Sequence, residues 1–354
     1  MHGPSHPLHG PSHPPPGPWT RKPLAPLLVE FLPQQNRHLN LWDLISIGVG
    51  GTVGSGIFVL LGAIAHKFAG PSTCLSFAIS GGAAGVSGCA FAEWSSHLPG
   101  GAAGSTYQYA YVALGEWPAV VAAACLTLEY GVSGAAVARS WGDKVLECWW
   151  KYVQHQYHHD DDDDDDDTTG TTTLNSHNWN PLAGLLCLLA VLLLTCGVQE
   201  AKRVTNVFTV LKVTLVLFLI LGGMYLSMWE PDSNPHPFRP FFPFGVAGTL
   251  RGATSSFFAY LGYDEVCCFA AEAKHPSKDI PRAVLSTIAI VTCLYVLASL
   301  ALIGMVEDAS NISETSAFPA AFASRGVQWA AQVAAAGEII TLPVVRTKMF
   351  WRFE

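Results

Sequence analysis

Three ionisable side chains interrupt apolar stretches of the chain, and these residues are the best placed to carry out chemistry. Lys212 is the only charged residue in 204–228, Glu129 is the only one in 117–138, and Glu338 lies in the last apolar stretch. A charged group at membrane depth is energetically costly and usually marks function. We therefore expect a relay of protons or cations through Lys212 and Glu129.

A structural role for the same residues stays open at the level of sequence. The long side chain of Lys212 can extend to the nearer membrane surface, or it can pair with a carboxylate that joins two helices. For Glu129, nothing in the sequence shows which helix or cavity its side chain faces.

The other reactive residue types do not form the patterns that enzymes use. The nine cysteines lie mostly in apolar stretches without a CxxC motif, which argues against a zinc site or a disulfide framework. The glycines of 48–56 follow an apolar helical pattern rather than a strand, so they do not form a phosphate-binding loop. Without the aspartate run 160–167, acidic residues equal the 19 basic ones. We expect no enzymatic activity, cofactor, metal or nucleic-acid partner.

The composition is that of an integral membrane protein. Half of the 354 residues are hydrophobic (50%) and only 13% are charged, against about a quarter in soluble domains. A membrane-spanning helix needs about 20 largely apolar residues. Such stretches predict about eight transmembrane helices: 41–65, 71–93, 117–138, 181–199, 204–228, 245–271, 284–306 and 326–345.

The segments outside these spans are polar and of low complexity. Proline, glycine and a repeated HGPSHP motif predict that 1–38 is a disordered tail. Lys and Arg are more frequent in alternate loops, which places both ends in the cytoplasm. This topology makes 150–178 an acidic extracellular loop and exposes Asn311, which lies in a glycosylation sequon. The last nine residues, 346–354, continue none of these patterns.

Two of the predicted spans are interrupted near their centres. The first carries GVGGTVGSGIF at 48–58, and the sixth carries FFAYLGYDE at 257–265. Glycines and polar groups destabilise a helix, and an open backbone in a membrane is tolerated only where it lines a cavity or lies inside protein. Interrupted helices five spans apart are typical of transporters built from two inverted repeats, which bind substrate between the interruptions.

Several motifs occur in an order that resembles one transporter family. The ordered set resembles the amino acid–polyamine–organocation superfamily and, within it, the cationic amino acid transporter group, over about 39–345. The motifs are GVGGTVGSGIFVLLG (48–62), AGPS (69–72), CAFAEWSSHLPGGAAGSTYQY (89–109), VARSW (137–141), FFAYLGYDE (257–265) and KHPSKDIPRA (274–283). The resemblance implies a LeuT-like bundle of inverted five-helix repeats. The second repeat stops at its third helix, so we expect an incomplete repeat in a C-terminally truncated chain.

The resemblance also implies a substrate site at the two interruptions. The backbone N–H groups of Ser55 and Gly56 would hold an α-carboxylate, and the carbonyls of Thr52, Phe258 and Leu261 would hold an α-ammonium. The full implied set of substrate-binding residues is Thr52, Gly54, Ser55, Gly56, Phe258, Ala259 and Leu261.

Coupling and gating residues follow from the same resemblance. Lys212 matches a lysine that takes the place of a sodium ion in sodium-coupled cousins, which implies proton coupling or facilitated exchange. Glu129 matches an acidic position of some relatives and is assigned to coupling with it. Phe258 corresponds to an aromatic gate over the substrate. Glu272 is the expected partner of an inner-gate cation, in a segment where His275 replaces the asparagine of many relatives.

The function expected from the sequence is secondary transport of amino acids, in particular the cationic ones arginine and lysine, by alternating access. The partners are then the amino acid, the lipid bilayer and protons, in a plasma membrane or a vacuolar or lysosomal membrane; the oligomeric state is not assigned. The open alternatives are a truncated isoform that does not transport, a membrane receptor or regulatory partner that binds amino acids, and a wrongly assigned end of the coding sequence.

Overall fold

The computed structural model describes residues 37–54, 56–97, 105–157, 180–195, 202–229, 239–270, 272–306 and 312–350. These residues form helices, with one isolated parallel bridge and no strand among them, so the predicted all-α fold is confirmed. The elements are, in order, α2 (Leu41–Thr52), η1 (Gly56–Leu60), α3 (Leu61–Ile64), η2 (Ala65–Ala69), η3 (Gly70–Ser72), α4 (Thr73–His97), α5 (Ser105–Leu114), α6 (Glu116–Tyr157), α7 (Pro181–Thr195), α8 (Lys202–Trp229), α9 (Gly245–Ser256), η4 (Phe257–Tyr260), α10 (Glu265–Cys268), α11 (Pro276–Met305), α12 (Ala317–Ser324) and α13 (Gln328–Phe350).

Some of these helices have the length and composition of membrane spans. Within the described residues, four stretches meet both criteria: Leu41–Ser96, Glu116–Trp149, Thr209–Met228 and Pro276–Met305. The first stretch holds the helical segments from α2 to η2 and then α4, and Gly70, with a φ of 59°, turns the chain between η2 and α4. The expected total of about eight spans stays a prediction.

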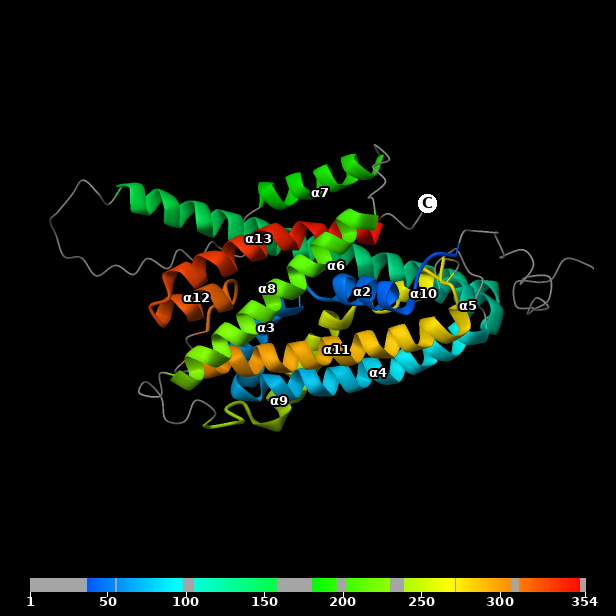
Figure 1. Ribbon diagram of the computed structural model, residues 1–354, viewed down its shortest axis with the longest axis horizontal. Coiled ribbons are helices and arrows are strands. Elements are labelled where there is room, and N and C mark those ends of the chain that lie inside the picture. The colour runs from blue at the N-terminus through cyan, green and yellow to red at the C-terminus, as the bar shows by residue number, and fades with distance from the viewer. Residues whose placement is uncertain are drawn as a thin grey trace, which may run out of the picture.

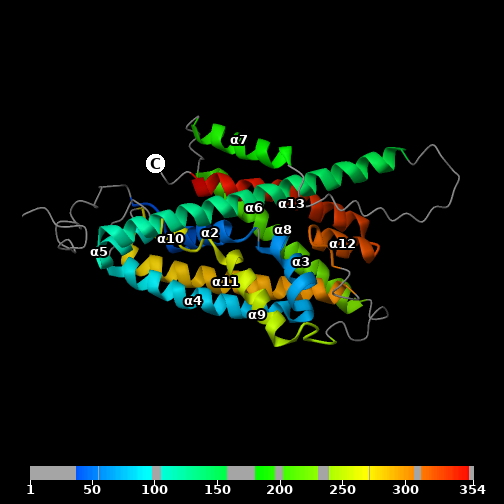
Figure 2. The same cartoon turned by 180° about the vertical axis from the view of Figure 1, so that it is seen from behind.

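The helices pack side by side into a bundle. α4 and α11 lie against each other along their lengths, and α2 packs against both α11 and α8 (Figure 1). α9 contacts α4 on its other side. The long helix α6 contacts α5, α7 and α13, and α7 lies outermost beside α6 and α13 in both views (Figure 2). The first broken helix therefore packs between unbroken helices, and the second lies against α4.

Helix α6 extends further than the sequence suggested. It runs without interruption to Tyr157, so residues 150–157 are helical although the acidic loop was expected to begin at 150. The only proline in α6, Pro118, lies in its first turn, where the ring removes no helical hydrogen bond. Without a proline in its interior, the helix continues beyond its apolar part. The short helices α5 and α12 were not predicted.

Both interrupted spans are broken helices. α2 ends at Thr52 because Val53 adopts an extended conformation with a ψ of 119°, and helical turns resume at Gly56 with π-helical geometry. α9 tightens into a 3₁₀ turn, after which Leu261 is extended with a ψ of 135° and Gly262 has a φ of 112°. The backbone therefore leaves the helix at the two stretches that the sequence singled out.

Candidate functional site

The two helix interruptions lie in direct backbone contact. A Cβ atom added to Gly262 would lie 3.2 Å from the carbonyl carbon of Gly51 and 3.4 Å from the amide nitrogen of Thr52. On the other side of the interruption, a Cβ atom on Gly56 would lie 2.7 Å from the Cβ of Ala259. Glycine is needed at these positions because only a bare backbone allows such close approach.

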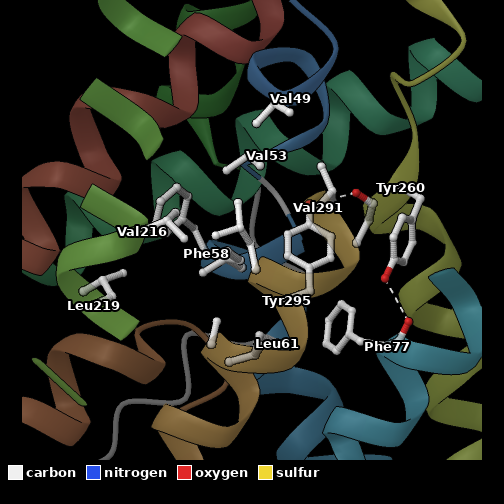
Figure 3. Packing of buried hydrophobic residues seen from close by; sticks show 14 of the residues in the cluster. Val49, Val53, Phe58, Leu61, Phe77, Val216, Leu219, Tyr260, Val291 and Tyr295 are labelled. Atoms are coloured by element: carbon white, nitrogen blue, oxygen red, sulfur yellow. Dashed lines mark hydrogen bonds between the residues drawn. The ribbon is translucent and has the colours of Figure 1, made fainter. Parts of the chain in front are cut away.

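Tyr295 of α11 joins the two interruptions. Its hydroxyl oxygen lies 3.0 Å from the carbonyl oxygen of Thr52 and 2.9 Å from that of Ala259. A hydroxyl has a single proton to donate, so the two carbonyls share this donor. The ring is fully buried and packs edge-on against Tyr260 and Phe77, with centroid separations of 5.4 and 5.3 Å (Figure 3).

Lys212 of α8 lies behind the first interruption. Its side chain is 1% exposed, and its Nζ donates to the carbonyl of Gly50 over 3.2 Å. Gly50 faces α8 closely, because a Cβ atom there would overlap the side chain of Thr209. The ammonium thus stays inside the bundle against the last turn of α2, and does not extend to the surface.

The other predicted substrate-binding residues lie around these contacts. Thr52 is buried and its hydroxyl donates to the carbonyl of Gly48 over 2.8 Å, while its own carbonyl faces Tyr295. The carbonyl of Phe258 accepts the N–H of Leu261 over 3.3 Å, and the carbonyl of Gly54 accepts the N–H of Phe58 over 3.1 Å.

The structure brings Thr52, Gly56 and Ala259 together around Tyr295, whereas Ser55 lies outside the described residues. A carbonyl oxygen has two lone pairs, so a carbonyl with one donor can still bind an ammonium group.

Glu129 lies on α6, near Asp264 rather than beside Lys212. Its side chain is exposed on α6, within electrostatic reach of Asp264 at the start of α10. The neighbouring Tyr130 donates from its hydroxyl to Asp264 Oδ2 over 2.7 Å. The two residues assigned to coupling, Lys212 and Glu129, therefore contact different helices, α2 and the region of α10.

Glu272, the predicted inner-gate residue, contacts the segment that precedes α2. Its carbonyl accepts the N–H groups of His38 and Leu39, each over 3.0 Å. Its carboxylate lies 3.8 Å from Nε2 of His38. The structure thus places Glu272 beside a histidine that the sequence did not single out. Asn311 lies outside the described residues.

Comparison with known proteins identifies the family. A family model described as "Amino acid permease" matches residues 39–345. The chain belongs to this family.

Several similar proteins are named cationic amino acid transporters. The vacuolar cationic amino acid transporter 4 of Arabidopsis thaliana is 33% identical over 312 residues, which cover 87% of this chain and 50% of the relative. The human cationic amino acid transporter 4 is 32% identical over 327 residues, which cover 92% of this chain and 49% of the relative. The methylthioribose transporter of Bacillus subtilis is 32% identical over 333 residues, which cover 94% of this chain and 68% of the relative.

The chain spans about half the length of several curated relatives that it matches. Family membership and the long apolar helices establish an integral membrane protein with an all-α fold, as predicted. The resemblance to the cationic amino acid transporter group is confirmed as well.

Sequence reasoning missed a buried ion pair in this chain. Lys144 of α6 pairs with Glu338 of α13, and the two side chains are 4% and 2% exposed. One turn earlier on α6, Trp141 Nε1 donates to the carbonyl of Ile339 over 3.0 Å. Lys144 lies beyond the predicted span 117–138, because the apolar pattern ends before this residue while the helix continues to Tyr157. The pair neutralises two charges that would each be costly to bury alone.

Tyr295 was missed for a different reason. It is one aromatic residue in a long apolar run, and such residues are usually part of the packed core. Its buried hydroxyl is the available signal, since a buried hydroxyl requires a partner.

Among the described residues, no group of His, Cys, Asp and Glu is arranged to hold a metal ion.

Proposed function

We propose that this chain binds amino acids between its two broken helices and moves them across a membrane by alternating access, as a secondary transporter. The observation that carries the proposal is the backbone contact between the two interruptions around Tyr295. An amino acid presents an anionic and a cationic group on one carbon. Helix N-termini attract the anion, and unwound carbonyls attract the cation.

The roles of the site residues in this proposal are those that the family resemblance implies, at two breaks that lie against each other. The backbone N–H groups of Ser55 and Gly56 hold the α-carboxylate at the point where helical turns resume. The carbonyls of Thr52, Phe258 and Leu261 hold the α-ammonium. Gly54 and Ala259 line the same position, and their small side chains leave room for the ligand.

The proposed substrates are cationic amino acids, and the support is that similar proteins are named cationic amino acid transporters. Transport is proton-coupled or facilitative, because the ammonium of Lys212 already supplies a fixed cation beside the first break. Glu129, near Asp264, takes part in the same coupling.

The remaining parts of the proposal concern gates and topology. Phe258 closes over the substrate, and Glu272 stabilises the closed inner gate. The N-terminus is cytoplasmic, Asn311 is a glycosylation site on the opposite side, and the chain resides in a plasma membrane or a vacuolar or lysosomal membrane.

Reconstitution into proteoliposomes tests the proposal. Uptake of labelled arginine, lysine, alanine and leucine is measured for the chain and for Gly56→Leu. A side chain at residue 56 meets the Tyr295 hydroxyl, which lies 2.5 Å from the added Cβ position. We expect arginine and lysine uptake in the unmodified chain and background uptake in the variant.

A matched control separates the site from general effects of a bulky residue. Gly82 on α4 is exposed, and an added Cβ meets nothing within 4 Å, so Gly82→Leu should leave uptake unchanged. Full uptake by Gly56→Leu would overturn the site assignment. Binding of labelled arginine without exchange across the membrane would favour the receptor or regulatory alternative.

A further inference from the structure

The short helix α5 lies between two stretches that can span a membrane. The stretch that contains α4 ends at Ser96, and the next one begins at Glu116 with α6. Because the chain leaves the membrane after α4 and enters it again with α6, α5 lies near the membrane surface at which both spans end. Both views show α5 at the end of the bundle, beside α4 and α6 (Figures 1 and 2).

One face of α5 packs on the protein. Tyr109 and Val112 are buried and form a small apolar cluster with Phe91 of α4. The ring of Tyr109 packs edge-on against Phe91 and stacks on Trp94 of α4, each with centroids 6.2 Å apart. These contacts fix which side of α5 faces away from the bundle.

The outward face of α5 is apolar as well. Side chains that recur at a spacing of three or four residues form this face, and we call them the α5 stripe: Tyr107, Ala110, Tyr111 and Leu114. Tyr107 and Leu114 are 37% and 58% exposed. The rings of Tyr107 and Tyr111 stack with centroids 6.0 Å apart. Because α5 contains no charged residue, its outward face would leave apolar surface in bulk water, which is unfavourable.

The α5 stripe leads along the chain into the exposed apolar surface of a membrane span. Trp117, in the first turn of α6, is exposed, and so are Val121 and Leu128 further along the same helix. Exposed apolar side chains on a spanning helix face lipid. Tyr and Trp favour the headgroup layer at the end of such a span, because the ring is apolar while the hydroxyl or N–H can stay hydrated.

The charges around the stripe indicate the type of lipid. No Lys or Arg occurs in residues 73–138, which include α4, α5 and the first half of α6. The nearest charged residues on either side of α5 are Glu93 and Glu116, and both are exposed. Anionic lipids are attracted by basic residues, whereas carboxylates and aromatic rings attract the ammonium group of a zwitterionic lipid.

We propose that the α5 stripe is a lipid-binding surface that lies in the headgroup layer of the membrane and takes zwitterionic phospholipids, those with a choline or ethanolamine group. Leu114 and the tyrosine rings face the upper part of the acyl chains, and the phenol hydroxyls stay among the headgroups. This surface anchors α5, which also contacts α10, to the bilayer. The inference does not depend on the proposed transport function.

A fluorescent label at residue 114 tests the depth of α5 in the full chain. Leu114 is replaced by a coumarin-bearing amino acid, and the protein is reconstituted into phosphatidylcholine vesicles. Bromine atoms on the acyl chains, either close to the headgroup or near the chain ends, quench the label from within the membrane, and iodide quenches it from water. We expect shallow bromines to quench residue 114 more strongly than deep bromines do.

Two control positions calibrate this measurement. At Leu128, about 18 Å along α6 from Glu116, deep bromines should be the stronger quenchers. Ser277 is exposed in the first turn of α11 beside Lys278, and iodide should quench a label there at least about fivefold more than at residue 114. Iodide quenching at residue 114 that equals that at Ser277 would overturn the proposal. Weak quenching by both lipid and iodide would overturn it too, because a second copy of the chain would then cover the stripe.

Hydroxyl-radical oxidation tests the same surface in the unmodified chain. The radicals form in water, and because Leu114 is 58% exposed in the fold, the protein alone would slow its oxidation only about twofold. In phosphatidylcholine nanodiscs we expect oxidation at least about fivefold slower than in a synthetic peptide of residues 105–114. Oxidation slowed only twofold would overturn the lipid contact. Stronger protection in nanodiscs of phosphatidylglycerol, an anionic lipid, would overturn the assignment to zwitterionic lipids.

Discussion

The two broken helices share the hydroxyl of Tyr295 but differ in their other restraints. Side chains of other helices restrain the first break: the ammonium of Lys212 binds the carbonyl of Gly50, and the hydroxyl of Tyr295 lies against the carbonyl of Thr52. The second break anchors itself with its own side chains. Tyr260 donates to the carbonyl of Phe77 over 2.8 Å.

The anchors of the second break continue beyond Tyr260. The hydroxyl of Tyr263 lies 2.8 Å from that of Ser87, so two tyrosines of this break reach α4. The first break is therefore restrained mainly through its backbone, and the second mainly through its own side chains. A substitution in the first break should act on binding, whereas removal of an anchor from the second should act mainly on stability.

The largest effect is expected where the two breaks touch. Gly262→Ala adds a methyl group 3.2 Å from the backbone of Gly51, at a residue whose φ is 112°. Strain of this kind costs about 1–3 kcal/mol and cannot be relieved by rotating a side chain. We expect arginine affinity to fall by up to about a hundredfold, because about 1.4 kcal/mol corresponds to a factor of ten. Binding of labelled arginine in detergent is the measurement.

Gly245→Ala is the matched control for this prediction. Gly245 also has a positive φ, of 67°, but an added Cβ there meets nothing within 4 Å. Gly245→Ala therefore introduces backbone strain without affecting the contact between the two breaks. Equal losses of affinity in the two variants would show that backbone strain, and not the contact with the first break, produces the effect.

The next largest effect concerns the cation behind the first break. Lys212→Met keeps a long side chain and removes the donor to Gly50. A hydrogen bond from a charged group contributes about 1.5–3 kcal/mol, so we expect uptake to fall by about tenfold or more. The fall is measured as arginine uptake with and without an imposed proton gradient. Lys212→Arg, which keeps the charge, is the control. Unchanged gradient-driven uptake in Lys212→Met would remove this residue from the coupling mechanism.

The comparison also explains how much of the site the sequence could reveal. The first break was visible because glycine is unfavourable in a helix, and the second because polar residues interrupt an apolar run at 257–265. Both signals are local. These two local signals predicted both broken helices. The charge of Lys212 in an apolar stretch added a residue that lies at the first break.

The parts that the sequence could not predict are contacts between distant residues. Tyr295 is 243 residues from Thr52, and Lys144 is 194 residues from Glu338. Each looks ordinary in its own segment, as a core aromatic residue or as a charge beyond an apolar span. Their roles depend on which helices become neighbours, and a hydrophobic pattern does not encode the register between α6 and α13.

A smaller effect is expected for the hydroxyl that joins the breaks. Tyr295→Phe removes the donor shared by the carbonyls of Thr52 and Ala259 and lets the two segments separate slightly. A typical hydrogen bond contributes about 0.5–1.5 kcal/mol, so we expect arginine affinity to fall by about two- to tenfold. Tyr225→Phe, at an exposed position on α8, is the control. Tighter binding by Tyr295→Phe would mean that the hydroxyl competes with the substrate ammonium for these carbonyls.

The smallest effect on binding is expected for the neighbouring tyrosine, and this prediction tests the comparison most directly. Tyr260→Phe is the same chemical change within the same aromatic cluster, but it removes an anchor to α4 rather than a link between the breaks. The carbonyl of Phe77 loses a buried donor, which should destabilise the protein by about 1 kcal/mol. Thermal unfolding in detergent should therefore show a lower midpoint, while arginine affinity stays within twofold. If Tyr260→Phe instead weakened binding as much as Tyr295→Phe, then anchorage and ligand contact would not be divided between the breaks, and both would have to be treated as one binding element.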